Sequence, residues 1–190
     1  MKQTVEKRNP NGVIDYIALA LTTFGVGLIP GAPGTYGSIV AVAIYLIIGW
    51  VEAPAAASGA GAGLSLSLVF FLISTFHLVI NGVALVAFSL AGIWASGRSI
   101  PLLGNDDPSE AVVDEVMGQL ITFCFIPFGL GWPFILAGFL LFRLFDIWKP
   151  YPINNLQNLS GGLGVCADDI VAGVYAGICL AIGYAIYLAV

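Results

Sequence analysis

Carboxylate side chains lie where apolar segments of the sequence begin or end. Two acids open one segment, a third lies near the end of the next, and two more open the last. If these segments are neighbouring antiparallel helices, all five carboxylates reach the same end of the bundle. Such oxygen ligands, completed by water and phosphate oxygens, are what Mg²⁺ binds in octahedral geometry. We therefore predict a Mg²⁺ site formed by Asp114, Glu115, Asp146, Asp168 and Asp169.

A simpler interpretation of these acids is that they cap helices and complement the helix dipole. It accounts for the four acids at segment starts, but not for Asp146, because the dipole disfavours a carboxylate at the end of a helix. Only two cations, Arg143 and Lys149, are close in sequence to the acids, and two cations cannot neutralise five carboxylates. A metal site is therefore the preferred interpretation.

One face of a predicted helix carries three charged residues, each three positions after the last: Arg143, Asp146 and Lys149. Pro150 and Pro152 then end this helix. The two cations are suited to hold a phosphate while Asp146 binds metal. The alternative is a salt-bridged stripe whose long side chains reach the membrane interface.

The segment 30–38 reads Pro-Gly-Ala-Pro-Gly-Thr-Tyr-Gly-Ser and opens an apolar helix. Glycines let backbone amides converge, and the N-terminus of a helix favours anions. We predict that Gly34, Thr35 and Ser38 contact a substrate phosphate. A plain turn with a helix cap explains the segment equally well, and the same two interpretations apply to the glycines of 161–164.

Three further residues have side chains that could act at such a site. Asp106 and Asp107 lie in a polar loop and are second-tier candidates for the same acidic cluster. The only histidine, His77, falls midway along an apolar segment, too deep in a membrane for phosphate transfer at its surface. We expect His77 to be structural.

The composition is that of a membrane protein. Of 190 residues, 59% are hydrophobic and 9% are charged, whereas soluble domains carry about 25% charged residues. Eight of the eleven acids fall between Asp106 and Asp169, so the negative charge is concentrated. Six scattered basic residues are too few for a nucleic-acid-binding surface.

Six apolar segments set the expected fold, because backbone in lipid must bond internally as helix and a spanning helix needs about 20 residues. We predict an all-α polytopic membrane bundle with about five spanning helices and one short interfacial or re-entrant N-terminal helix. Residues 1–190 form one domain with a polar tail at 1–12. The segments are 14–29, 38–51, 64–97, 111–128, 133–148 and 165–189.

The linkers indicate the topology. Two of them, 52–63 and 129–132, lack Lys and Arg. The other three, 30–37, 98–110 and 149–163, together hold prolines, glycines, acids and bases. If the first segment does not span, the tail and these three linkers share one face with all six basic residues. The positive-inside rule makes that face cytoplasmic. If the first segment spans, the tail moves to the opposite face.

Taken together, these motifs resemble the phosphatidylglycerophosphatase A family. The most specific part is the Arg-x-x-Asp-x-x-Lys-Pro block at 143–150, followed by Gly-Gly at 161–162 and Asp-Asp at 168–169. The Gly-Ala-Pro-Gly-Thr segment at 31–35, Asp-Asp-Pro at 106–108 and Val-Asp-Glu at 113–115 add to it. The tail and the Ala/Gly linker carry none of the resemblance.

The resemblance implies a Mg²⁺-dependent phosphatase of the bacterial inner membrane, multi-pass, with its active site facing the cytoplasm. Its phospholipid substrate would be phosphatidylglycerophosphate, and its products phosphatidylglycerol and inorganic phosphate. The acids would bind metal, while Arg143 and Lys149 would hold phosphate. Direct attack by water is the favoured route, since no Asp-x-Asp nucleophile signature is present.

Two other functions are compatible with acids in a membrane protein. Acids within a membrane also mark ion pathways, so an acid-lined cation channel or transporter is one alternative. The acids lie at one face only, which disfavours a route across the membrane. The second is an enzyme similar to the CDP-alcohol phosphotransferases, whose long Asp-Gly-x-x-Ala-Arg signature is missing here.

Overall fold

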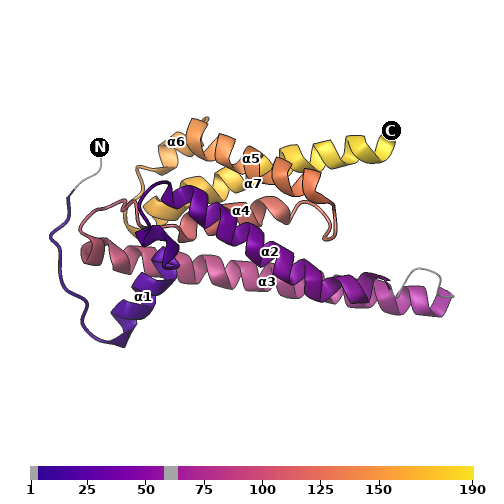
Figure 1. Ribbon diagram of the computed structural model, residues 1–190, viewed down its shortest axis with the longest axis horizontal. Helices are drawn as coiled ribbons and strands as arrows, with labels where there is room; N and C mark the ends of the chain where they lie inside the picture. The colour runs from indigo at the N-terminus through magenta and orange to yellow at the C-terminus, as the bar shows by residue number, and fades with distance from the viewer. Residues whose placement is uncertain (1–3, 58–63) are drawn as a thin grey trace.

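The structure, a computed structural model, describes residues 4–57 and 64–190, without the side chains of residues 51–57, 64–74 and His77. The expectation for His77 and the sequence 58–63 therefore lie outside the described residues. Helices form all the regular elements of the described chain (Figure 1), which confirms the all-α prediction. They are α1 (Val13–Thr23), the short 3₁₀ helix η1 (Val26–Leu28), α2 (Pro33–Ala57), α3 (Leu64–Leu103), α4 (Val113–Phe123), α5 (Trp132–Trp148), α6 (Ile153–Leu156) and α7 (Gly161–Ala189).

Three helices are long and apolar enough to cross a membrane. They contain the stretches Pro33–Trp50, Leu78–Leu103 and Gly161–Ala189. The 17 residues of α5 extend about 26 Å, and the 11 residues of α4 only about 16 Å, against a bilayer core of about 30 Å. The prediction of about five spans is thus supported for three helices, and α4 is too short to be a fourth.

The N-terminal helix α1 is short because its backbone turns at Phe24. Phe24 and Gly25 both take positive φ angles, 47° and 71°, which a continuing α-helix cannot accommodate. The 11-residue helix therefore cannot span, as expected for an interfacial or re-entrant segment. Its apolar side chains Val13, Ile14 and Ile17 are exposed.

Several boundaries differ from the sequence expectations. Helix α2 begins at Pro33, where proline at the first helical position is well tolerated, and it continues through 52–57, part of an expected linker. Helix α3 runs on to Leu103 with Pro101 inside it, although 98–110 was expected to be a loop. The expected glycine loop 161–164 is the first turn of α7.

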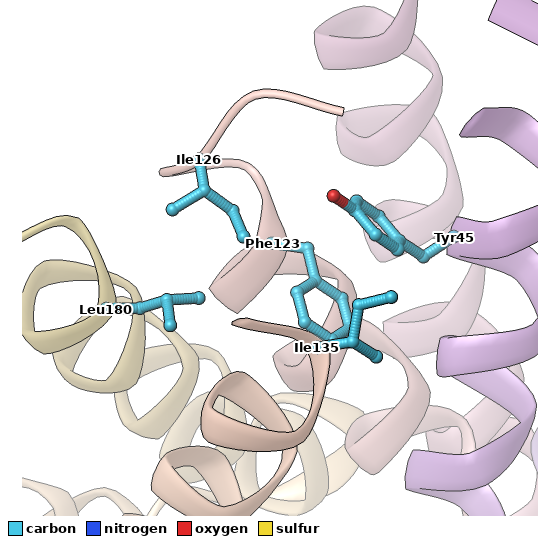
Figure 2. Close-up of a cluster of buried hydrophobic side chains, with 5 residues drawn as sticks. All are labelled: Tyr45, Phe123, Ile126, Ile135 and Leu180. Atoms are coloured by element: carbon cyan, nitrogen blue, oxygen red, sulfur yellow. The ribbon is translucent and has the colours of Figure 1, made fainter. Parts of the chain in front are cut away.

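The short helix α4 is the buried centre of the bundle and packs against α2 and α7. At its C-terminal end, Phe123 stacks on Tyr45 of α2 with ring centroids 4.4 Å apart. Figure 2 shows this apolar cluster, which Ile126, Ile135 and Leu180 complete. The cluster fixes one end of α4, so that the opposite end, with Asp114 and Glu115, has a defined position.

Four helix ends meet at the end of the bundle opposite this apolar cluster. In Figure 1 the starts of α2, α4 and α7 and the end of α5 lie together near α6, while the α4–α5 connection lies at the opposite end. This is the arrangement that alternating helix directions predicted.

Candidate active site

A cavity of about 800 Å³ opens where these helix ends meet. Its walls come from the start of α2, the loop before α4, the start of α4, the end of α5 and the residues around the start of α7. The structure thus gathers residues far apart in sequence. Among the predicted site residues, those that line it are Gly34, Thr35, Asp106, Asp107, Asp114, Glu115, Arg143, Asp146, Lys149, Asp168 and Asp169.

Three of the carboxylates form a compact group. Asp114, Glu115 and Asp169 each offer one oxygen, and these oxygens lie within 4.8 Å of one another. Asp114 is 8% exposed and Asp169 4%. Among the described residues, Asp114 Oδ1 and Glu115 Oε2 have no hydrogen-bond partner. Burying charged groups without compensation costs several kcal/mol per ion, so this group is suited to hold a hard divalent cation.

The other two acids are paired with the two nearby cations. Arg143 Nη1 donates to Asp146 Oδ2 over 2.6 Å, and Lys149 Nζ donates to Asp168 Oδ2 over 2.5 Å. Lys149 Nζ also lies 3.9 Å from Asp146 Oδ1. The five acids predicted to bind one or two Mg²⁺ ions therefore divide into a group of three and two that form ion pairs.

Lys149 reaches Asp168 because the chain turns at this residue. It caps α5 in the left-handed conformation, with φ 47°, rather than continuing the helical stripe of Arg143 and Asp146. Burial lowers the pKa of Lys149, but the hydrogen bond and charge of Asp168 outweigh it, so the pKa is raised overall. The ammonium group therefore stays charged at the edge of the cavity. A positive φ is uncommon for a lysine and occurs often at functional sites.

The glycine segment at the start of α2 lets its backbone lie close to the side chains of the site. A Cβ on Gly34 would overlap Glu115 Oε1 and lie 3.0 Å from Arg143 Nη1. Thr35 lines the cavity, whereas Ser38 does not. The Ser38 hydroxyl is buried and donates to the carbonyl oxygen of Gly34, so the structure does not bring it to the expected phosphate position.

The glycines of 161–164 also permit close packing. A Cβ on Gly162 would overlap the carbonyl oxygen of Ile93 in α3, and one on Gly164 would overlap that of Leu159. Gly161 and Gly164 line the cavity, but Gly162 serves the contact between α3 and α7. Gly162 therefore has a role in helix packing and does not belong to a phosphate-binding loop.

Sequence reasoning did not single out several cavity residues. Gln157 Nε2 donates to Asp168 Oδ2 over 3.1 Å, so it shares this oxygen with Lys149. Ser109, Asn158 and Ser160 also line the cavity. The only feature of the sequence that could have indicated these residues is their position in linkers rich in charge, proline and glycine.

The fold and the cavity define an all-helical membrane protein with an acidic site at one end of its helices. Within that class, the chain belongs to the phosphatidylglycerophosphatase A family, whose sequence profile matches residues 19–184. The protein is a phosphatase. The family match confirms the resemblance drawn from the sequence motifs, and it covers every residue predicted to form the site.

Similar proteins come from three bacteria. A Bacteroides thetaiotaomicron protein with the provisional name phosphatidylinositol-3-phosphatase is 37% identical over 85% of this chain and 89% of its own. The Escherichia coli phosphatidylglycerophosphatase A is 32% identical over 85% of this chain and 80% of its own. The Haemophilus influenzae phosphatidylglycerophosphatase A is 33% identical over 86% of each. No solved structure matches the chain.

Proposed function

We propose that this phosphatase removes the terminal phosphate of phosphatidylglycerophosphate with the help of Mg²⁺, giving phosphatidylglycerol and inorganic phosphate. The family and the names of the E. coli and H. influenzae relatives support this substrate. The observation that carries the proposal is the group of Asp114, Glu115 and Asp169, buried beside two cation–carboxylate pairs in one cavity.

The residues present fit a magnesium ion. All three donors are carboxylates with oxygens close together, and Asp114 and Glu115 each have one buried oxygen without a hydrogen-bond partner among the described residues. Asp114, Glu115 and Asp169 would hold the ion, with Asp146 and Asp168 beside them. A bound Mg²⁺ would supply charge stabilisation at the phosphoryl oxygens and a more acidic water. Such help is needed, since phosphate-monoester hydrolysis demands accelerations up to about 10²¹.

The cations of the chain are placed to receive the phosphate. Arg143 and Lys149 both line the cavity and already hold carboxylate oxygens, which resemble phosphate oxygens in charge and geometry. The planar Arg143 would orient the phosphate by paired hydrogen bonds, and Lys149 would add a point charge. Thr35 offers a hydroxyl at the same wall. Water is the proposed nucleophile.

Basic residues support a cytoplasmic location of the cavity in a bacterial inner membrane. Arg143 and Lys149 line it, and the Lys7 side chain lies beside Gly104, just after α3, where an added Cβ would lie 3.4 Å from it. Arg8 and Arg98 both bind Asp15 in α1, close to the same end of α3. The positive-inside rule assigns such an end to the cytoplasm. The N-terminal tail shares this end through a bridge between Thr4 and Asn105, as a non-spanning α1 requires.

The alternatives weighed from the sequence are not favoured. The family match, which covers nearly the whole chain, supports neither a channel or transporter nor an enzyme similar to the CDP-alcohol phosphotransferases.

The name of the B. thetaiotaomicron relative raises the separate question of which lipid headgroup is the substrate, because phosphatidylinositol 3-phosphate is also a phospholipid with a phosphate monoester. The experiment must therefore compare headgroups.

The test is phosphate release by the purified protein in detergent from three lipids: phosphatidylglycerophosphate, phosphatidylinositol 3-phosphate and phosphatidate. We expect the highest kcat/KM with phosphatidylglycerophosphate, loss of activity in EDTA and recovery with added Mg²⁺. Preference for the inositol lipid would change the substrate, and full activity in EDTA would exclude the metal. The Asp169→Asn variant controls for contaminating phosphatases.

A further inference from the structure

An ion cluster around the buried Asp15 joins the N-terminal tail to the long helix α3 through two partly exposed arginines. Asp15 in α1 is 0% exposed and binds two arginines through both of its oxygens. Arg8 donates over 2.6 and 3.0 Å, and Arg98 of α3 donates through Nε over 2.7 Å. The backbone amide of Asn11 adds a bond of 2.8 Å. Charge-assisted, bidentate contacts of this kind are among the strongest hydrogen bonds in proteins.

The tail that carries Arg8 runs along the end of α3 into the next loop. The Arg8 amide donates to the Pro101 carbonyl over 2.9 Å, and the Val5 amide donates to the Gly104 carbonyl over 3.2 Å. Thr4 then forms the bridge with Asn105. The tail therefore holds the beginning of the segment 104–112, which connects α3 to α4.

The end of the same segment is held by α1 itself. The Val112 amide donates to the carbonyl of Thr22 over 2.9 Å, and the Thr22 hydroxyl lies 3.0 Å from the hydroxyl of Ser99 in α3. Val112 immediately precedes α4, whose first turn carries Asp114 and Glu115. Asp15 thus belongs to a unit, formed by the tail and α1, that contacts both ends of the segment.

The segment 104–112 contributes directly to the cavity. Asp106, Asp107 and Ser109 line it, and the segment delivers the two carboxylates of α4. A loop with both ends fixed keeps its side chains in place, whereas a displacement of about 1 Å can cost about 100-fold in rate. Arg8 and Asp15 precede residue 19, where the family match begins, so these two residues lie outside the matched region.

We propose that Asp15 is a positioning residue for the active site: through Arg8 and Arg98 it holds the tail and α1 against α3, and thereby fixes the segment 104–112 and the start of α4. Asp15 does not line the cavity and touches no reacting group. Its effect on activity rests on the proposed phosphatase function, but its effect on the segment does not.

The experiment compares wild type with Asp15→Asn, which keeps the shape of the side chain and removes its charge. Amide hydrogen exchange is measured on the full chain in detergent, with the loop 124–131 at the opposite end as internal reference. We expect exchange in 104–112 to rise at least tenfold while 124–131 is unchanged. Phosphate release from phosphatidylglycerophosphate should show kcat at least tenfold lower, and Asp15→Glu should recover part of both effects.

A matched control and a milder variant complete the design. Glu6→Gln removes an exposed acid from the same tail and should leave exchange and kcat unchanged. Arg98→Gln leaves Asp15 bound to Arg8, so it provides a folded variant with an intermediate effect if Asp15→Asn does not fold. Unchanged exchange in 104–112 with either variant would overturn the proposal, as would a kcat that falls only in proportion to the folded fraction. A wild-type chain inactive on lipid monoesters would instead remove the proposed function, and the exchange result would still decide the role of Asp15.

Discussion

The ammonium group of Lys149 lies 2.5 Å from Oδ2 of Asp168, so the end of α5 is tied to the start of α7 across the cavity. Together with the Arg143–Asp146 pair, this contact neutralises two of the five clustered acids. The remaining three are the ones whose oxygens lie close enough to share an ion. The chain's own cations thus leave an excess of negative charge at this group, which a divalent cation would reduce.

The Lys149–Asp168 pair predicts that stability and activity respond differently when both residues are replaced. Lys149→Met leaves the buried Asp168 carboxylate without its cation, at a cost of about 1–3 kcal/mol for an unsatisfied buried group. We expect a lower Tm in detergent and an increased KM. The double variant Lys149→Met with Asp168→Asn should recover the Tm, because neither charge remains, but not the activity. Recovery of activity in the double variant would contradict a role of Lys149 in holding phosphate.

The group of three carboxylates predicts how stability responds to Mg²⁺. Asp169→Asn should abolish phosphate release and, without divalent ions, leave the Tm equal to or above wild type, because one unpaired buried charge is removed. Added Mg²⁺ should raise the Tm of wild type, by linkage worth about 2.7 kcal/mol at 100 times Kd, and should not raise that of the variant. Thermal unfolding with and without EDTA measures this. Glu110→Gln, an acid of the same region that does not line the cavity, should behave as wild type.

The close approach of α2 predicts a steric effect at Gly34. A methyl group there would overlap the Glu115 carboxylate, so Gly34→Ala should displace it and lower kcat/KM by about 100-fold without changing any charge. Gly49 is the matched control on the same helix, because an added Cβ would lie 3.5 Å from Phe128, an ordinary contact. Gly49→Ala should keep its activity and gain slightly in Tm from the higher helix propensity of alanine. Equal activity of both variants would show that α2 does not shape the site.

The sequence predicted the structure best where a charged residue marks the boundary of an apolar segment. The acids near the end of α5 and at the start of α4 could be placed because each acid interrupts an apolar segment. Asp168 and Asp169 were expected to open the last helix, but α7 already begins at Gly161, about two turns earlier. The length of α4 could not be predicted, since residues 124–128 are as apolar as a helix but turn at the end of the bundle. Hydrophobicity alone does not distinguish a spanning helix from a shorter one continued by an apolar turn.

Long-range contacts were the main source of error. Arg98 marked a loop in the sequence, yet it lies in α3, where it binds Asp15, 83 residues away. Gly162 suggested a phosphate loop, yet it allows α7 to approach the Ile93 carbonyl. Neither partner can be identified from local spacing. The pairing of Lys149 with Asp168 similarly depends on a left-handed turn that no local pattern required.

The ion cluster of α1 predicts a pH dependence of stability. The Arg8 hydrogen bond, followed by the Asn11 amide, holds the pKa of Asp15 well below its usual range. A carboxyl whose pKa is lowered in the folded state stabilises it fully above the unfolded value of about 3.9, and this contribution is lost as the pH falls towards the folded value. The Tm difference between wild type and Asp15→Asn should therefore be constant from pH 7 to about pH 5 and then shrink towards pH 3.

The same measurement in an Arg8→Gln background identifies the cause. Without the Arg8 guanidinium, Asp15 retains Arg98 and the Asn11 amide, so its pKa in the folded state should rise towards the ordinary range. The Tm difference between the Arg8→Gln variant and the variant that also carries Asp15→Asn should then be smaller at pH 7 and vary less with pH. A wild-type difference that stays the same from pH 7 to pH 3 would show that Asp15 is not held ionised by its arginines. A pH dependence unaffected by Arg8→Gln would assign the effect to the remaining partners, Arg98 and the Asn11 amide.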